Sequence, residues 1–385
     1  MPGRSLADTC VDCKNAAPSV SVRKRDLCQN CFIRYVNSKV MKRMERYRQK
    51  VTPKDMRRKL LLPLSFGVSS LTLLHILSQQ LDRQNPGGRG QTAYDVHVLN
   101  IEGTTTGNAE LSGRSALEFI REAYPRHTYS GIPLHSMFSY DKDIKDVMST
   151  FGNSEFIDNP SKTDQERLDA FKHSLSTATS RADINAVLLT RLIVAFAKDN
   201  GCEGILWGDS DSRLAAKAIA NVAKGRGSSL PWEICDIASP WGVQFNFPLR
   251  DLFKHELDLY ISIVLPNLLP VVVENPKAVE NLSNKNMSIE DLMSHYVATQ
   301  GEKYPGVMAN IVRTIDKLQA PSLEDAGSKC TMCGMPVVAN TLESSSALDE
   351  TISWGNEHAG KKPFTCYACA RSCSDIKSLT PVSKS

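Results

Sequence analysis

The sequence of 385 residues contains no apolar stretch long enough to cross a membrane. Its first residues, MPGRSLADTC, lack the apolar core of a secretory signal peptide. Strong net charge is also missing, because 46 Lys and Arg stand against 42 Asp and Glu, and no internal repeat is evident beyond paired cysteine motifs. These absences exclude a membrane-spanning chain and a repeat array, and they lead us to expect a cytoplasmic protein.

Cysteine, by contrast, is abundant and unevenly placed. Of eleven cysteines, eight form four Cys-x-x-Cys pairs near the two ends of the chain, with Cys202, Cys235 and Cys373 outside them. Fourteen residues separate the first two pairs, and thirty-two separate the last two. In a reducing compartment this spacing favours metal over disulfides, and four thiolates are a tetrahedral ligand set for zinc. The sequence therefore predicts two structural zinc sites, one of Cys10, Cys13, Cys28 and Cys31 and the other of Cys330, Cys333, Cys366 and Cys369.

The spacing leaves alternatives open at these sites. Four cysteines also suit an iron–sulfur cluster, and Cys373 or His358 is placed to replace one ligand of the second site. The first site lies in a segment too short to bury its own core, so we expect metal binding to supply much of its folding free energy. Residues 341–362, inside the second site, are rich in Ser, Glu and Gly and are expected to be disordered.

A basic segment follows the first cysteine motif. Residues 39–59 contain ten Lys or Arg against Glu45 and Asp55, and Pro53 is expected to separate two short helices. Such density suits an RNA backbone, although a solvated helix face explains it as well. The RNA-binding candidates are Lys42, Arg43, Arg46, Arg48, Lys50, Lys54, Arg57, Arg58 and Lys59.

The chain then predicts a strand, a tight turn and a helix. Leucines at 60–64 form a short apolar run suited to a buried strand, and Leu73, Leu77 and Leu81 recur with helical spacing. Ser69 or Ser70 is expected to cap the helix. The free N–H groups at the start of such a helix attract an anion, so this turn is a candidate phosphate site.

Strands and helices alternate beyond this turn. We expect strands at 94–101, 127–134 and 202–208, and helices at 114–124, 163–177, 182–198, 213–224, 254–264, 288–299 and 307–318. Residues 136–162 show little periodicity and are expected to be an insertion. The alternation predicts an α/β fold whose parallel sheet is joined by crossover helices. Cys202 and Cys235 lie in or beside predicted strands and are expected to be buried thiols.

Three segments resemble the PP-loop ATP pyrophosphatases. The turn Ser65-Phe66-Gly67-Val68-Ser69-Ser70 is similar to their Ser-Gly-Gly-x-Asp-Ser motif, except at Phe66 and Ser69. Gly208, Asp209 and Asp211 partly match the Gly-His-Asn-x-Asp-Asp motif of the tRNA-modifying members, although capping of the next helix explains the two aspartates equally well. Pro248-Leu249-Arg250 resembles a segment of the tRNA thiolation branch. The resemblance implies a nucleotide site, here vestigial, at Ser65, Gly67, Ser69, Ser70, Asp209 and Asp211.

The order of these motifs resembles the second-subunit family of the cytoplasmic complex that 2-thiolates the wobble uridine of tRNA. That resemblance implies tRNA binding and a heterodimer with a catalytic paralogue, cytoplasmic tRNA 2-thiolation protein 1. A thiocarboxylated ubiquitin-related modifier would donate the sulfur. The cysteines that hold an iron–sulfur cluster in catalytic members are missing at 175–180 and near 271–274, so ATP and the cluster are expected in the partner alone. Two alternatives stay open: an active ATP-dependent tRNA sulfurtransferase, and a zinc-ribbon factor that binds RNA or DNA.

The predicted organisation has five parts. A zinc module at 1–38 precedes the basic arm at 39–59 and a PP-loop-like α/β domain at 60–270. A helical extension at 271–329 and a second zinc module at 330–385 complete the chain. The α/β domain is thus flanked by two zinc-ribbon modules.

Overall fold

The computed structural model describes residues 8–47, 58–85, 92–102, 115–151, 159–273, 287–318, 320, 328–337 and 364–374. The chain divides into two compact units. Unit 1 comprises Met1–Gly131, Leu206–Arg213 and Phe247–Asn275, and unit 2 comprises Ile132–Ile205, Leu214–Asn246 and Pro276–Ser385. No helix among the described residues combines the length and apolar character needed to span a bilayer.

Unit 1 begins with a small hairpin and a long helix. Strands β1 (Val20–Val22) and β2 (Arg25–Leu27) pair antiparallel around a two-residue turn. Arg23 and Lys24 both have positive φ, of 50° and 67°, which is the backbone of a type I′ turn. Helix α1 (Gln29–Arg43) follows directly, and the short η1 (Glu45–Tyr47) ends this part. The predicted break between module and arm at residue 38 falls inside α1, so 37–43 form one helix with the zinc module.

The α/β part of unit 1 follows the predicted alternation. Its elements are β3 (Lys59–Pro63), α2 (Val68–Gln84), β4 (Asp95–Glu102), α3 (Ala116–Ala123), β5 (Thr128–Pro133), α11 (Lys254–Val264) and η4 (Pro266–Val271). Strands β3 and β4 are parallel, with Leu61 opposite His97, and the strand order is β5-β4-β3. Ser115 and Glu118 form a capping box at the start of α3. The predicted α/β fold with a mostly parallel sheet is confirmed here.

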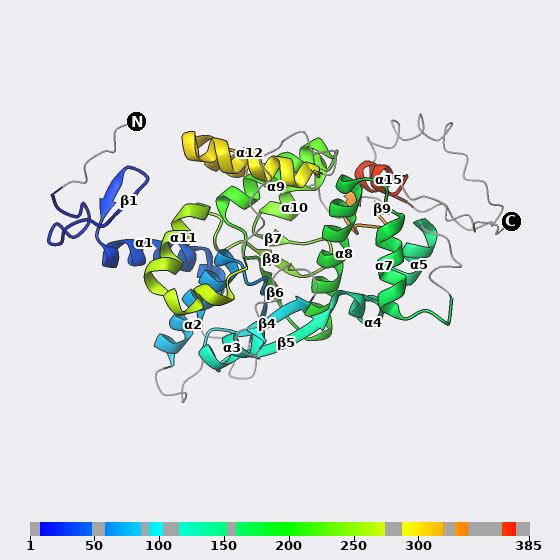
Figure 1. Ribbon diagram of the computed structural model, residues 1–385, viewed down its shortest axis with the longest axis horizontal. Helices are drawn as coiled ribbons and strands as arrows, with labels where there is room; N and C mark the ends of the chain where they lie inside the picture. Colours follow the sequence, from blue (N-terminus) through cyan, green and yellow to red (C-terminus); the bar gives the residue numbers. More distant parts are fainter. Residues whose placement is uncertain are drawn as a thin grey trace. The chain divides into compact units, whose positions relative to one another are not determined.

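One hydrophobic cluster joins the N-terminal helix to the α/β part of unit 1. Phe32, Val36 and Val40 are fully buried on one face of α1, in the same cluster as the leucines of β3 and α2. Helices α1, α2 and α11 pack against one another (Figure 1). Burial of each large apolar side chain contributes about 1.5–3 kcal/mol. The N-terminal module is therefore held by packing as well as by its cysteines.

Unit 2 is mainly helical. Its helices are α4 (Met137–Tyr140), α5 (Ile144–Phe151), α7 (Asp164–Ser174), α8 (Ala178–Asp199), α9 (Asp211–Ala223, whose first turn belongs to unit 1), α10 (Leu230–Ile234), α12 (Ile289–Lys303), α13 (Pro305–Ile315) and α15 (Tyr367–Ser374). The 3₁₀ turns η2 (Leu134–Ser136) and η3 (Gly227–Ser229) precede α4 and α10. The strands β6 (Gly204–Leu206), β8 (Gln244–Asn246) and β7 (Ile237–Ala238) lie in the order β6-β8-β7, and β9 (Ser328–Lys329) pairs with β10 (Pro336–Val337). Helix α8 contacts α4, α12 and α15.

The segment expected to be an irregular insertion contains regular structure. Helix α5 buries Ile144, Val147 and Met148, which are spaced three and four residues apart along one face. The pattern is too short to stand out in the sequence. Residues 152–158, and residues 341–362 of the expected disordered insertion, lie outside the described residues.

Candidate functional site

The candidate phosphate turn joins β3 to α2 within unit 1. Gly67 is the N-cap of α2, with an extended backbone (φ −71°, ψ 156°), and its carbonyl accepts from Leu71 N at 3.1 Å. Ser69 and Ser70 therefore lie in the first helical turn, and the prediction that one of them caps the helix is wrong. Ser70 Oγ instead donates to the Gly67 carbonyl at 3.0 Å and lies 3.4 Å from Ser65 Oγ. The backbone enters the helix earlier because Gly67 itself takes the cap conformation.

Phe66 occupies an unusual backbone position in this turn. Its φ is 56°, in the left-handed region that favours glycine, and its side chain is buried in the core cluster of unit 1. Its carbonyl accepts from Val273 N at 2.9 Å. Gly67, in contrast, has negative φ, and a Cβ there would meet Ser65 Oγ at an ordinary 3.6 Å. The backbone conformation that favours glycine therefore occurs at Phe66 and not at Gly67.

Gly208, which follows β6, lies against the start of α2, so the second PP-loop-like segment (208–211) meets the first (65–70). A Cβ at Gly208 would lie 3.1 Å from Ser70 Cα, so a side chain here would require the backbone at the first turn of α2 to shift by a few tenths of an ångström. Asp209 follows and is half-buried, whereas Asp211 is buried and donates its N–H to the Leu252 carbonyl at 2.8 Å. The two motifs thus meet at one place in unit 1.

Neither Asp209 nor Asp211 is the cap of α9. Ser210, which lies between them, accepts from Arg213 N at 3.3 Å through its Oγ. Asp211 belongs to the first turn, where its negative charge is favourable for the helix dipole. The expected capping by the aspartates is therefore corrected to capping by Ser210.

Cysteine is scarce around this turn. Within the described residues of unit 1, the cysteines are the four of the N-terminal motif. In catalytic members of the resembled family, cysteines at two positions hold the iron–sulfur cluster. In this chain the first position contains Thr177, which caps α8 by accepting from Ser180 N, and the second contains Val271, which is buried. Cys202 and Cys235 are buried thiols, as predicted.

The N-terminal cysteines form a compact cluster suited to a metal ion. The Sγ atoms of Cys10, Cys13, Cys28 and Cys31 all lie within 4.8 Å of one another, and Cys13 Sγ is 3.8 Å from Cys28 Sγ. A tetrahedral site with Zn–S bonds of about 2.3 Å has S–S edges of about 3.8 Å. The backbone N–H of Cys13, chiefly, lowers the pKa of Cys10 to about 6, which favours the thiolate. The donor set fits zinc.

The C-terminal cysteines repeat this arrangement in unit 2. The Sγ atoms of Cys330, Cys333, Cys366 and Cys369 also lie within 4.8 Å of one another, with 3.8 Å between Cys333 and Cys366. Cys373 lies on the next turn of α15, outside this cluster, and burial raises the pKa of its thiol. The four paired cysteines therefore form a complete set of four sulfurs that could hold a metal ion, and Cys373 is not part of it. His358 lies outside the described residues.

A buried ionic network supports the C-terminal cluster. Arg226 donates to Cys369 Sγ at 3.4 Å and to Asp183 Oδ2 at 2.6 Å, and Lys224 donates to Asp183 Oδ1 at 2.8 Å. All three charged side chains are at most 8% exposed. Burial alone would raise the pKa of Asp183, but the two cations outweigh it and hold the pKa below its usual range. Lys224 also pairs with Glu290, so the ion pairs balance one another, and Arg226 is the cation that reaches a cluster sulfur. Sequence patterns do not predict this network, because positions 183, 226 and 369 are distant in the chain.

The predicted RNA-binding residues are only partly described. Lys42 and Arg46 are exposed on α1 and η1, whereas Arg43 forms a bidentate pair with Asp251 at 2.7 and 3.0 Å. Arg58 donates to the Arg46 carbonyl at 3.0 Å and lies over the Tyr47 ring, and Lys59 begins β3. Arg48, Lys50, Lys54 and Arg57 lie outside the described residues, as does Pro53 with the expected helix break.

A solved structure shares this architecture. The U34-tRNA thiolase NcsA from Methanococcus maripaludis, solved with its [4Fe-4S] cluster, aligns with a TM-score of 0.52 over 90% of this chain and 97% of that chain. At 15% identity, the likeness shows the fold alone. The chain is thus an α/β protein with the fold of that structure and with a cluster of four cysteines in each unit.

Sequence comparison identifies the family. The family model for cytoplasmic tRNA 2-thiolation protein 2 matches residues 288–371. The protein of that name from Coccidioides immitis is 53% identical over 97% of this chain and 99% of its own length, and that from Ajellomyces capsulatus is 58% identical over 89% and 95%. The chain therefore belongs to the cytoplasmic tRNA 2-thiolation protein 2 family. The family's name agrees with the expected cytoplasmic location.

Proposed function

We propose that this chain is a non-catalytic, tRNA-binding subunit of the cytoplasmic complex that replaces oxygen with sulfur at C2 of the wobble uridine, U34. Membership of the thiolation protein 2 family over nearly the whole chain carries this proposal. Its partner would be the catalytic paralogue, cytoplasmic tRNA 2-thiolation protein 1, in a heterodimer. A thiocarboxylated ubiquitin-related modifier would supply the sulfur to that complex.

The geometry of the turn supports a non-catalytic role. In this chemistry ATP activates the uridine oxygen as an adenylate, so the turn has to stabilise phosphate charge. Phe66 places a side chain where the family's glycine leaves bare backbone, and Ser69 supplies no carboxylate beside it. The vestigial site would thus comprise Ser65, Gly67, Ser69, Ser70, Asp209 and Asp211, with ATP and the iron–sulfur cluster held by the partner.

The two cysteine clusters would hold zinc and act structurally. Each offers four thiolates at tetrahedral separations, and each is joined to surrounding packing or ion pairs. Bound zinc would crosslink chain segments whose own cores are small. Residues Lys42 and Arg46 would extend a basic surface from the N-terminal site toward RNA.

An active sulfurtransferase is the second candidate. The retained approach of Gly208 to Ser70, and the 3.4 Å between Ser65 Oγ and Ser70 Oγ, favour it. A zinc-ribbon factor binding RNA or DNA would account for the cysteines and the basic residues, but not for the α/β fold or the family.

Reconstitution separates the first two candidates. The purified chain, its paralogue, and both together are mixed with tRNA, ATP and the thiocarboxylated modifier, and pyrophosphate release and 2-thiouridine are measured. We expect product only when the paralogue is present, and no loss when Ser65 or Ser70 is changed to Ala. Ser69→Asp in the isolated chain should not produce pyrophosphate. Pyrophosphate release by the isolated wild-type chain that Ser70→Ala abolishes would establish the enzyme instead.

A further inference from the structure

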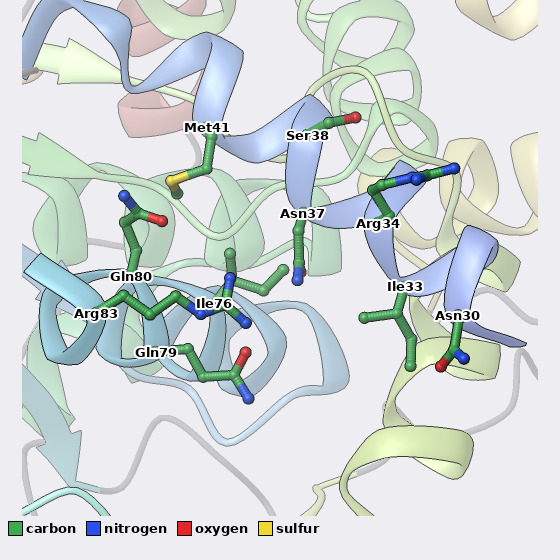
Figure 2. A pocket seen from close by; sticks show the side chains of 10 residues that line it. All are labelled: Asn30, Ile33, Arg34, Asn37, Ser38, Met41, Ile76, Gln79, Gln80 and Arg83. Carbon is green, nitrogen blue, oxygen red and sulfur yellow. The ribbon is translucent and has the colours of Figure 1, made fainter.

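A pocket of about 340 Å³ lies between α1 and α2, entirely within unit 1. Its apolar walls are Ile33 and Met41 of α1 and Ile76 of α2, as Figure 2 shows. The volume is at the lower end of the range of about 300–1,000 Å³ that is usual for small-ligand pockets. The pocket is thus large enough for one compact, flat group with a polar rim.

The polar lining consists mostly of amides and arginine. Asn37 points into the pocket from α1, and Arg83 extends toward it from α2 (Figure 2). Asn37 Oδ1 accepts from Tyr260 OH at 3.0 Å, which fixes the amide and leaves its N–H groups as donors. Gln79 and Gln80 add two further amides, and no Asp or Glu is among the described residues that line the pocket.

Basic residues continue from the pocket along the exposed side of α1. Arg34 lines the rim, turns outward in Figure 2, and donates to Cys31 Sγ at 3.5 Å. Lys42 is exposed about two turns further along α1, rotated by about 80° around the helix axis, and Arg46 is exposed in η1 beyond it. A polyanion that follows these three cations would pass the mouth of the pocket.

This combination matches one nucleotide of a single-stranded RNA segment. Side-chain amides form paired hydrogen bonds with base edges, apolar groups cover a base face, and arginine contacts phosphate. We infer that the α1–α2 pocket binds one unstacked nucleotide of the bound tRNA, with its base against Ile76 and the amides and its phosphate at Arg83. The inference rests on the proposed tRNA-binding function and adds a specific site to it.

The test uses the heterodimer with intact tRNA. Arg83→Gln removes the phosphate contact, and Gln79→Trp fills the pocket. Arg121→Gln is the matched control, because Arg121 is an exposed arginine of unit 1 on α3 and does not line the pocket. Binding is measured over a range of salt concentrations, and the tRNA is probed by chemical footprinting. Circular dichroism and metal content verify that each variant is folded.

Both pocket variants should weaken tRNA binding about tenfold, and Arg83→Gln should reduce the salt slope by about 0.7, the value for one single-strand phosphate. One or two nucleotides should lose protection, while the rest of the footprint stays. Arg121→Gln should leave the footprint intact.

Unchanged footprints in both variants, with the wild-type heterodimer still protecting tRNA, would overturn the pocket assignment and leave the proposed function standing. A pocket that instead binds a peptide tail gives that same result. Absence of any tRNA protection by the wild-type heterodimer would overturn both proposals.

Discussion

Position 66 has a left-handed backbone and carries a buried aromatic ring. Loss of a buried ring costs about 3–5 kcal/mol, while glycine recovers the roughly 1–2 kcal/mol that an L-residue pays in this region. Phe66→Gly should therefore lower the free energy of unfolding by about 1–4 kcal/mol. Because the carboxylate and the cluster cysteines are still missing, the isolated variant should release no pyrophosphate from ATP. Urea unfolding and a pyrophosphate assay measure both effects.

Phe66→Ala is the matched control for this variant. It removes the same ring, but alanine, like any residue with a Cβ, still pays the free-energy cost of a left-handed backbone. This variant should therefore be about 1 kcal/mol less stable than Phe66→Gly. Pyrophosphate release by the glycine variant would show that the ring alone blocks the site and would contradict the non-catalytic assignment.

Three buried histidines of unit 1, at 75, 97 and 127, predict acid sensitivity. Burial, aided by a nearby cation, lowers the pKa of each from 6.5 to about 4. On acidification the unfolded chain therefore binds these protons first, so this stability is complete above pH 6.5 and is lost as the pH falls from 6.5 to 4. The urea midpoint, measured across this range, should decrease accordingly.

His127→Gln isolates one of these titrations. His127 Nε2 lies 2.6 Å from Ser78 Oγ, and a glutamine can keep this hydrogen bond without titrating. The variant should show a shallower loss of stability between pH 6.5 and 4 than the wild type. Identical pH profiles would mean that His127 does not contribute.

At the level of elements, hydrophobic periodicity predicted most of the α/β part. Helix α11 has the predicted bounds of 254–264, and β3, β4 and β5 each lie within two residues of expectation. Two features were not predictable. The β1–β2 turn uses Arg23 and Lys24 at positive φ, where turn-forming residues such as Gly or Asn are expected. Helix α2 begins after Gly67, which has no side chain to form a cap, so the preference for Ser at the N-cap placed the start of the helix too late.

The candidate site was predictable only as separate motifs. Sequence spacing gave all eight clustered cysteines, because Cys-x-x-Cys turns are local. The contact of Gly208 with Ser70, and the pairing of Arg43 with Asp251, depend on chain segments more than 100 residues apart. Such contacts follow from topology and not from local pattern.

The basic helix α1 carries a prediction that the structure refines. Arg43 is paired with Asp251, so Arg43→Glu would place two carboxylates together and destabilise unit 1. Lys42→Glu with Arg46→Glu changes only exposed side chains and should alter the unfolding free energy by less than about 0.5 kcal/mol each. The double variant should weaken tRNA binding by the heterodimer and flatten its salt dependence, because fewer counterions are released.

The control for α1 is the same double charge reversal at Lys303 and Lys317, which are exposed in unit 2. It changes net charge equally and should affect tRNA binding less. An unchanged salt slope in the Lys42 and Arg46 variant would make α1 an ordinary solvated helix.

On the scale of the whole molecule, each compact unit contains one four-cysteine site, and each site is tied into its unit differently. In unit 1, the helix that follows Cys28 shares a hydrophobic core with β3 and α2. In unit 2, Arg226 links the Cys369 sulfur to Asp183 of α8. Metal loss should therefore disturb more than the short cysteine segments themselves.

Metal analysis tests this arrangement. Protein purified without added metal should contain about two zinc ions per chain, one for each set of four thiolates. Cys28→Ser and Cys369→Ser should each reduce the content to about one, because a site lacking one sulfur loses much of its affinity. Cys369→Ser should lower the stability of unit 2 more than Cys28→Ser lowers that of unit 1. The reason is that the buried Arg226 would lose a thiolate partner. Cys235→Ser, a buried thiol outside both clusters, should keep both ions. Iron in place of zinc at either site would contradict the structural role and make an iron–sulfur cluster the better assignment there.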